Sequence, residues 1–327
     1  MKVLHLMAGL GEASGVANIA RRFARVQAER GDSAILLAPA FKWNPIYFGL
    51  LFAIRAWWKA RTADEIWVHC SWTFPVWYGA WLAKLFGKKL VVVPEGSCDP
   101  KRLHNHAGWK KRLVAPLDRW VLRQADEVLA LCKDEIEWTE GFEPSAKMRF
   151  ERVPLFLNDE FLQPPLTPHS STSPLHVLFL GRVEDPLKGV RFLERAVREL
   201  GEVGVSPERS ELRSRRYAGC RSRTVELRIV SDHFGEELEK DWAWCDVLCL
   251  PTLSDNFGLV VAEALERGKK VITTDGASAW APPEAVQSKS KSGVEQWRDR
   301  LLYLKGFRDG TDEKRVELLK NAIRSLI

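Results

Sequence analysis

The chain has 327 residues, a formal net charge of +6, 46% apolar residues and 28% charged residues. This length allows two domains, each with its own core, and the balance of apolar and charged residues excludes a mostly disordered chain. The most apolar segment, Trp43 to Arg61, has only about a dozen residues before Arg55 interrupts it, which is too short to span a bilayer.

The N-terminus and the cysteines are typical of a cytoplasmic protein. The first residues, "MKVLHLMAGLGEASG", form a brief apolar run that ends before Glu12 and does not resemble a secretory signal. The six cysteines are Cys70, Cys98, Cys132, Cys220, Cys245 and Cys249. They form no Cys-x-x-Cys pair, which predicts reduced core thiols and neither zinc ligands nor disulfides.

Short apolar runs alternate with longer helical patterns through the first half of the chain. Strands are expected at 2–8, 33–39, 66–71, 89–95 and 127–132. Continuous apolar strands separated by helices indicate a parallel sheet that is covered on both faces.

The alternation begins again after a segment rich in proline, serine and threonine, Gln163 to Pro174. Further strands are expected at 176–181, 227–231, 247–251 and 270–275. The fold class is therefore α/β. We expect two Rossmann-like, doubly wound parallel-sheet domains at 1–162 and 175–327, with a linker at 163–174 and a ligand cleft between them.

An arginine-rich segment, 206–223, interrupts the second domain between a helix and the strand at 227. Its weak periodicity favours a solvated surface insertion, and an anion-binding arm is the alternative.

The first candidate site is the glycine-rich "GLGEASG", with Gly9, Gly11 and Gly15, directly after the first strand. Such a loop lets a phosphate or sugar approach the backbone at a helix N-terminus. Its G-x-G-x-x-x-G spacing differs from the dinucleotide fingerprint, and a plain strand-to-helix turn explains it equally well.

The second candidate is "GRVEDPLKG", which begins at Gly181 and places Arg182 and Lys188 around a proline turn. Two cations at the carboxyl end of a strand suit a diphosphate, whose growing negative charge they could stabilise. Solvated surface charges are the alternative.

The third candidate is "SDNFGLVVAEAL", in which a helix is expected to open near Gly258, with Asp255 and Asn256 as caps. The first-turn N–H groups would form an anion site. Glu263 lies in an otherwise apolar run, where a charge needs a partner or a ligand, and its carboxylate would face ribose hydroxyls. A salt bridge to a neighbouring helix is the alternative.

The span from Gly181 to Trp280 resembles the donor half of the GT-B glycosyltransferases, specifically the retaining family 4 (group 1) type. The resemblance implies that Arg182 and Lys188 hold the donor diphosphate, and it places the later acid of the E-x7-E element, the ribose ligand, on Glu263. The earlier acid falls on Asp255, where glutamate is usual. These four are the candidate catalytic residues. Donor-binding residues also expected are Gly11, Gly181, Asn256, Phe257, Gly258 and Leu259.

The first half resembles the acceptor domain of this family more loosely, and it carries Glu95-Gly96 where many members have a His-Gly pair. The family implies transfer from a nucleotide diphosphate sugar, such as a UDP- or GDP-sugar, with retention of configuration, no required cofactor and no bound metal. The sequence contains no Asp-x-Asp, which agrees with metal independence.

The acceptor prediction rests on tryptophans and cations in the first half. Ten of the 14 tryptophans lie within 43–138, and "KRLHNHAGWKKR" at 101–112 has five Lys/Arg and no acid. Tryptophan stacks on sugars or lies at membrane interfaces, and clustered cations favour anionic head groups. Acceptor-binding residues expected here are Trp72, Glu95, Gly96, Lys101 and Arg102.

We therefore expect a glycan or lipid-linked acceptor in the synthesis of lipopolysaccharide or another cell-envelope polysaccharide. The enzyme would be cytoplasmic, with an anionic membrane surface as a candidate partner and peripheral attachment to the inner face of the membrane. The segment 45–58 would lie in the core or at the interface. A non-catalytic module that binds nucleotide or anionic glycan is the alternative. Nucleic acid is not an expected partner, because no nucleic-acid-binding signature accompanies the cations.

Overall fold

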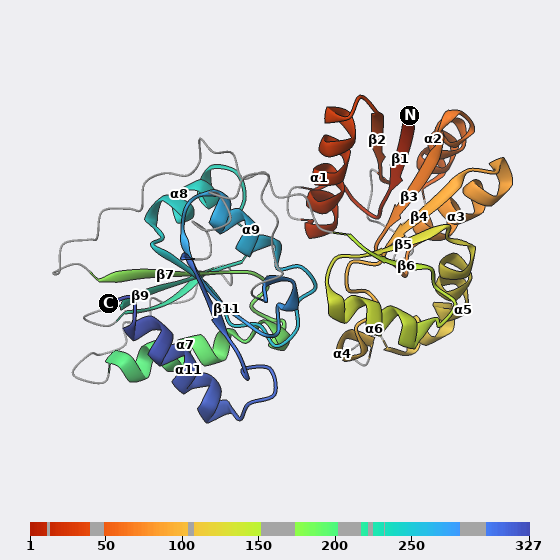
Figure 1. The fold of residues 1–327 in the computed structure, drawn as a ribbon. Coiled ribbons are helices and arrows are strands. Elements are labelled where there is room, and N and C mark those ends of the chain that lie inside the picture. The colour runs from red at the N-terminus through yellow and green to blue at the C-terminus, as the bar shows by residue number, and fades with distance from the viewer. Residues whose placement is uncertain are drawn as a thin grey trace. The chain divides into compact units, whose positions relative to one another are not determined.

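The computed structural model describes residues 1–11, 14–39, 49–103, 108–151, 174–201, 217–221, 225–231, 233–281 and 299–327. The chain divides into two compact units, Met1–Pro154 and Leu155–Ile327 (Figure 1). The predicted linker falls, apart from Pro174, outside the described residues. Both units are α/β, as the sequence predicts.

The N-terminal unit contains a sheet of six strands in the order β2-β1-β3-β4-β5-β6. Its strands are β1 (Lys2–Leu6), β2 (Ser33–Leu37), β3 (Glu65–His69), β4 (Lys89–Val93), β5 (Glu127–Ala130) and β6 (Met148–Phe150). Every neighbouring pair is parallel. The five strands predicted from apolar runs are all present. Strand β6 was not predicted, because it is only three residues long and two of them are exposed.

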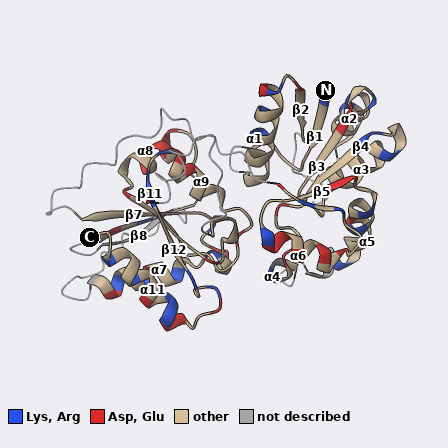
Figure 2. Ribbon diagram, viewed as in Figure 1, with Lys and Arg blue, Asp and Glu red and all other residues tan. Residues whose placement is uncertain are grey.

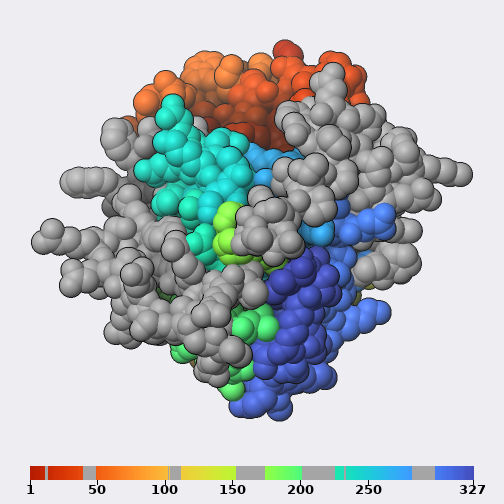
Figure 3. All heavy atoms as spheres, turned by 90° about the vertical axis from the view of Figure 1, so that its left-hand side faces the viewer, coloured from red at the N-terminus to blue at the C-terminus, as the bar shows by residue number. Residues whose placement is uncertain are grey.

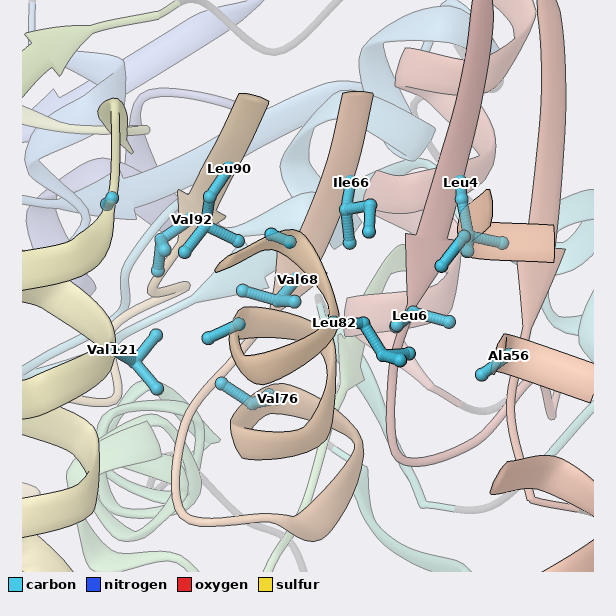
Figure 4. Packing of buried hydrophobic residues seen from close by; sticks show 14 of the residues in the cluster. Leu4, Leu6, Ala56, Ile66, Val68, Val76, Leu82, Leu90, Val92 and Val121 are labelled. Carbon is cyan, nitrogen blue, oxygen red and sulfur yellow. The ribbon is translucent and has the colours of Figure 1, made fainter. Parts of the chain in front are cut away.

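Helices cover both faces of this sheet. They are α1 (Gly15–Glu29), α2 (Leu50–Thr62), α3 (Phe74–Phe86), α4 (Pro100–Leu103), α5 (Gly108–Gln124) and α6 (Lys133–Phe142). One face of β1, β3 and β4 packs against α2, α3 and α5 in the core shown in Figure 4. The opposite face receives α1, whose Ala17 and Ala20 contact Met7. A Cβ on Gly79 of α3 would lie 2.6 Å from the Val68 side chain, so α3 approaches the sheet closely.

The C-terminal unit contains a second sheet, in the order β12-β11-β10-β7-β9-β8. Its strands are β7 (Leu175–Leu180), β8 (Tyr217–Arg221), β9 (Val225–Val230), β10 (Val247–Leu250), β11 (Lys270–Thr274) and β12 (Leu301–Leu304). The strands are parallel except for β8, which pairs antiparallel with β9 at the sheet edge. Part of the arginine-rich segment thus forms an edge strand, and 206–216, 222 and 223 lie outside the described residues.

The helical segments of this unit are η2 (Pro186–Lys188), α7 (Val190–Gly201), α8 (Glu236–Trp244), α9 (Leu259–Glu266), η3 (Ser278–Trp280) and α11 (Asp312–Arg324). Helices α7 and α11 lie side by side, green and dark blue in Figure 3. Lys320 of α11 donates to Glu199 of α7 at 3.0 Å, and Phe192 meets Phe307 with ring centroids 5.8 Å apart. These contacts bury one face of the sheet.

Both sheets have their topological switch point at the first strand of the unit. Neighbouring crossovers run in opposite directions between β1 and β3 in the N-terminal unit, and between β7 and β10 in the C-terminal unit. In open α/β sheets, ligands bind outside the carboxyl ends of the strands at such points. The loops after these four strands are therefore the first places to examine.

The apolar segment that includes 49–58 forms an amphipathic helix. In α2, Phe52, Ala56 and Ala60 are buried, whereas Leu50 and Trp58 are 69% and 63% exposed. The predicted core placement therefore holds for one side of this helix, and the other side is exposed. None of the helices in the described part of the chain is long and apolar enough to cross a membrane.

Candidate functional site

The loop that follows β7 is shaped by glycine and by a local cap. Asp185 accepts a hydrogen bond from the Leu187 amide at 3.0 Å and so caps η2. The same carboxylate lies 3.3 Å from the Arg182 guanidinium, whose side chain is 65% exposed. Arg182 therefore projects from the carboxyl end of β7 and is held there only loosely, because an exposed ion pair of this kind contributes little.

Lys188 ends η2 and turns toward the loop that follows β10. Its Nζ donates to Asp255 Oδ2, and both side chains are largely buried, at 12% and 14% exposure. The structure thus brings together Lys188 and Asp255, which are 67 residues apart in the sequence. Because β7 and β10 are neighbours, this pair lies at the switch point of the C-terminal sheet.

Backbone contacts hold the two loops together. The Leu253 amide and the Thr252 hydroxyl both donate to the Leu187 carbonyl, at 2.7 and 3.0 Å. Gly189 has a φ of +67°, and a Cβ placed there would lie 2.0 Å from the Pro251 carbonyl oxygen. Only glycine fits this close approach, so the sequence "GRVEDPLKG" places its second glycine where the two loops meet.

The predicted capping role of Asp255 and Asn256 is wrong. Helix α9 begins at Leu259, and its N-cap is Gly258, which has a left-handed φ of 67° and contributes no side-chain hydrogen bond. Asp255 is engaged by Lys188, and its amide donates to the Gly276 carbonyl at 2.8 Å. Asn256 and Asp255 lie two and three residues before the cap position, so neither side chain occupies it and the helix starts on a glycine.

Glu263 is not enclosed by apolar side chains. It is half-buried and shares the partly exposed side of α9 with Leu259, Val260 and Glu266, whereas Val261, Ala262, Ala264 and Leu265 are buried. The helical period explains why: positions 259, 263 and 266 fall on one face. The Glu263 carboxylate is therefore partly exposed on this face, and a ribose-binding role for it remains a proposal.

The segment between β10 and α9 is fixed by a tryptophan from farther along the chain. The indole Nε1 of Trp280, which is fully buried, donates to the Phe257 carbonyl at 2.5 Å. The two rings are tilted, with centroids 5.4 Å apart. Phe257 and Asn256 are themselves nearly buried. These two predicted donor-binding residues thus have a clear structural role in shaping the loop.

The N-terminal unit has a second group of functional candidates at the carboxyl ends of β3 and β4. Cys70, Trp72 and Glu95 have φ values of 69°, 66° and 55°, and they are the non-glycine residues with positive φ in the described part of the chain. Such conformations cost of order 1–2 kcal/mol each and cluster at functional sites. The Glu95 carboxylate Oε1 lies 2.9 Å from His69 Nδ1, and the Gly96 amide donates to the buried Glu135 carboxylate.

Trp72 is held by three contacts. Its amide donates to Asp118 at 2.9 Å, its indole donates to the Ser97 carbonyl at 3.2 Å, and its ring meets Phe142 edge-on. Burial raises the pKa of Asp118 to about 6, partly offset by the hydrogen bonds from Trp72 and Trp77. A half-buried indole fixed in this way is a suitable platform for a sugar ring.

The remaining predicted site residues include Gly11, Lys101 and Arg102. Gly11 is exposed, and a Cβ there would meet nothing within 4 Å, so its loop needs no glycine for space. Glu12, next to it, lies outside the described residues. Lys101 is exposed and its amide donates to Asp99 at 2.8 Å. Arg102 lies in α4, and its side chain is not among those described.

The cysteines and the potential metal ligands are the next candidate functional groups. Burial raises the pKa of the Cys98 and Cys245 thiols to about 12, so both stay protonated at neutral pH. Within the described ranges, His, Cys, Asp and Glu form no group of three or more that could hold a metal ion.

Several residues at these loops escaped the sequence reasoning. Asp185 and Trp280 lie within the span that resembles the donor half, but neither was named as a site residue. His69 and Glu135 support the predicted residues from segments that carry no motif. The histidines gave a usable signal, because His5 and His69 each stand in an otherwise apolar strand, "KVLHL" and "EIWVH", where a polar residue needs a partner. Trp280 and Asp185 gave none, since tryptophan in a core and aspartate before a proline are both common.

Comparisons with known proteins identify the family and the fold. A family model described as "Glycosyl transferase 4-like domain" matches residues 5–154, and one described as "Glycosyl transferases group 1" matches residues 174–304. Together they cover most of the chain. A comparison with curated protein sequences found no significant match.

Several solved structures have the same fold. Anabaena HepE, in complex with UDP and glucose, matches with a TM-score of 0.59 and 14% identity over 99% of this chain and 89% of that chain. Sucrose-phosphate synthase from Thermosynechococcus elongatus matches with a TM-score of 0.53 and 14% identity over 100% and 99%. An α-glucosyltransferase, in complex with UDP and DNA, matches with a TM-score of 0.55 and 12% identity over 98% and 95%. At these identities, the likeness establishes the fold.

Proposed function

We propose a donor, a stereochemical course and an acceptor class for this chain, which belongs to the group 1 glycosyltransferases of the GT-B fold and is thus an enzyme that transfers sugars. The donor is a UDP- or GDP-sugar, bound by the C-terminal unit. The sugar is transferred with retention of configuration to a glycan or lipid-linked acceptor of the cell envelope, bound by the N-terminal unit.

The single observation that carries the donor site is the Lys188–Asp255 pair at the switch point of the C-terminal sheet. Asp255 keeps the ammonium group at the carboxyl ends of β7 and β10, where a ligand would bind. Arg182, from the same loop, supplies a second cation on an exposed side chain. In the proposal, a diphosphate accepts hydrogen bonds from both cations and from the start of α9, which stabilises the leaving group without a metal.

Asp255 and Glu263 have separate proposed roles. Asp255 lies beside the transferred sugar and orients Lys188 toward the diphosphate. Glu263, on the partly exposed side of α9, accepts hydrogen bonds from the donor ribose. Support for the UDP-sugar comes from Anabaena HepE, which has the same fold and was solved with UDP and glucose.

Turnover and stereochemistry test the reaction. The purified enzyme is incubated with UDP- and GDP-hexoses and extracted envelope glycolipids, and the anomeric configuration of the product is read by proton NMR. We expect a product that retains the donor configuration. An inverted product contradicts the retaining course. Nucleotide binding without turnover of any donor supports the non-catalytic alternative.

A basic and apolar surface on the N-terminal unit supports a membrane-borne acceptor. Of the 13 large apolar side chains that are exposed on the described residues, eight lie on α2, α3 and α5: Leu50, Leu51, Ile54, Trp58, Trp81, Leu85, Leu113 and Leu117. These three helices pack in succession against one face of the sheet, so their outer sides form a continuous α2–α3–α5 surface.

The charge of this surface suits an anionic membrane. Helices α2, α3 and α5 contain nine Lys and Arg but a single acid, Asp118, which is buried (Figure 2). Arg61 lies over the Trp58 ring, 5.4 Å from its centroid. Exposed leucine and tryptophan flanked by cations are typical of proteins that bind the lipid interface. We propose that this surface docks on an anionic bilayer, as peripheral attachment to the inner face of the membrane requires.

Vesicle sedimentation tests the attachment. We expect binding to vesicles of phosphatidylglycerol and phosphatidylethanolamine that weakens with salt, and a loss of about tenfold or more in the double variant Leu50→Ser, Trp58→Ser. The matched control is Phe234→Ser, which removes an exposed aromatic ring from the C-terminal unit. Equal binding by both variants, or no binding by the wild type at low salt, would refute the docking surface.

A further inference from the structure

Four side chains form a continuous buried hydrogen-bond chain across the switch point of the N-terminal sheet. Gln27 Oε1 lies 2.8 Å from His5 Nε2, His5 Nδ1 lies 2.9 Å from His69 Nε2, and His69 Nδ1 lies 2.9 Å from Glu95 Oε1. The residues come from α1, β1, β3 and the turn after β4. All four side chains are buried, with the His69 and Glu95 side chains at 0% and 3% exposure.

The Gln27 amide oxygen, at one end of the hydrogen-bond chain, sets the direction of every hydrogen bond in it. An amide oxygen only accepts, so His5 Nε2 carries a proton. In neutral His5, Nδ1 is then an acceptor, and His69 Nε2 must donate to it. A neutral His69 is left with an unprotonated Nδ1. The Glu95 carboxyl must therefore be the donor, which requires that it carry a proton.

The surrounding charges favour this arrangement. Burial, and then the nearby Glu135 carboxylate, hold the pKa of Glu95 well above its ordinary value. Burial lowers the pKa of His69 far below its usual range, and His5 lowers it further. Burial lowers the pKa of His5 to about 4, although Gln27 and Glu65 act in the opposite direction. Glu65 in turn pairs with Lys89 at 3.1 Å.

The Glu95 end of this hydrogen-bond chain lies in a strained turn. Glu95 and Gly96 have left-handed φ values of 55° and 74°, directly after β4. On the far side of the turn, Glu135 accepts from the Gly96 and Leu131 amides. The turn is thus held between a carboxylate that binds its backbone and an imidazole that binds its side chain. A charged Glu95 here would add a second buried anion beside Glu135.

We propose that Glu95 is a neutral, proton-carrying positioning residue, held by Gln27, His5 and His69, which fixes the Glu95–Gly96 turn for binding acceptor sugar hydroxyls. The acceptor role of the turn rests on the proposed function, whereas the protonation of Glu95 does not. In this arrangement Glu95→Gln is a faithful mimic, because its amide nitrogen donates to His69 Nδ1 in the same direction. Loss of this proton as the pH rises removes the donor to His69 Nδ1 and loosens the turn.

Nitrogen-15 NMR of histidine-labelled protein tests the protonation directly. We expect both His5 and His69 to be neutral, with a proton on Nε2 and a bare Nδ1, in the wild type and in Glu95→Gln. A Gln27 amide turned the other way would reverse every donor, place a proton on His69 Nδ1 and leave Glu95 ionised. That spectrum would overturn the proposal whatever the reaction of the enzyme.

Gln27→Leu supplies the matched test of direction. It removes the acceptor that orients the chain while keeping the side-chain volume, so His69 is free to donate to Glu95, and Glu95 should ionise at lower pH. In the double variant Gln27→Leu, Glu95→Gln this ionisation cannot occur. The free energy of unfolding is measured against pH for both variants. A pH profile that shifts in Gln27→Leu but not in the double variant supports the proposal, and equal shifts in both refute it.

Transfer to methyl hexosides, used as probe acceptors, tests the positioning. We expect Glu95→Ala to raise the KM for the probe about tenfold or more with a smaller effect on kcat, and Glu95→Gln to stay within about threefold of wild type and keep its activity at alkaline pH. Glu95→Gln as poor as Glu95→Ala would overturn the role. Absence of transfer by the wild type would count against the proposed acceptor class, and the NMR result would still decide the proton assignment.

Discussion

The two switch points of this glycosyltransferase hold opposite kinds of polar groups. In the C-terminal unit, the ends of β7 and β10 carry the Lys188–Asp255 pair, which retains some contact with solvent. In the N-terminal unit, the ends of β1, β3 and β4 hold His5, His69 and Glu95 in an enclosed chain. The edge of the C-terminal sheet carries charged groups, whereas the edge of the N-terminal sheet buries its titratable groups and keeps them neutral.

This contrast follows the proposed ligands. A diphosphate brings negative charge and is best bound by cations that are already oriented. A sugar acceptor brings only hydroxyls, for which fixed neutral hydrogen-bonding groups suffice. The same strand order therefore supports two kinds of site, and the loops after the strands decide which.

The largest effect should come from separating the loops after β7 and β10, which carry Lys188 and Asp255. In Gly189→Ala, the new Cβ would meet the Pro251 carbonyl, in a left-handed conformation that alanine disfavours. We expect a loss of unfolding free energy of about 3 kcal/mol or more, together with weaker nucleotide binding. Thermal unfolding measures it. Gly141→Ala is the control, because a Cβ there meets nothing within 4 Å, and unchanged stability in both variants would refute the close approach.

A smaller, pH-dependent effect should distinguish the N-terminal edge, where His5, His69 and Glu95 lie. The native state keeps a proton on Glu95 that the unfolded state releases, so stability falls as the pH rises from the ordinary pKa of glutamate toward the raised value. Above about pH 6.5 the histidines are neutral in both states and do not mask this slope.

Glu95→Gln should therefore flatten the decline of stability above neutral pH, by up to about 1.4 kcal/mol per pH unit. Urea unfolding at a series of pH values measures the slope. The exposed Glu137→Gln on α6 is the control and should leave the slope unchanged. A slope in Glu95→Gln identical to wild type would mean that Glu95 is ionised in the native protein.

The smallest effect concerns the cap of η2. Asp185→Ala removes the acceptor for the Leu187 amide and should cost about 1 kcal/mol of stability. Asp185→Asn keeps an acceptor at the cap but loses the charge beside Arg182, and it should be nearly neutral because that guanidinium is exposed. If both variants were equally unstable, the ion pair and not the cap would be the important contact.

The sequence predicted the fold well because its apolar strands are short and continuous. The run "VLCL" is buried along its whole length and "KLVVV" after its first residue, and they appear as β10 and β4. The edge strands β6, β8 and β12 were not predicted: β6 has only three residues, β8 lies in the arginine-rich segment, and β12 has only four residues.

Within the candidate sites, the sequence located the loops but not the partners of each residue. It placed Lys188 and Asp255 in separate motifs, and only the pairing of β7 with β10 brings them together. It gave Asp255 a capping role, but the helix begins three residues later, with Gly258 as its cap, and an apolar pattern does not fix a helix start that closely. It named Glu95 but not the histidines behind it, since their contacts span 64 and 26 residues.

Calorimetric titration of the nucleotide site tests the central claim most directly. UDP, GDP, ADP and their hexose conjugates are titrated into the wild type, Lys188→Ala and Glu263→Ala, with Lys240→Ala and Glu237→Ala, both exposed on α8, as controls. We expect one base to be preferred, and a loss of affinity of about 10- to 100-fold in Lys188→Ala and a smaller one in Glu263→Ala. Binding that is unchanged in both site variants, or absent for every nucleotide, would contradict a donor site at the switch point of the C-terminal sheet.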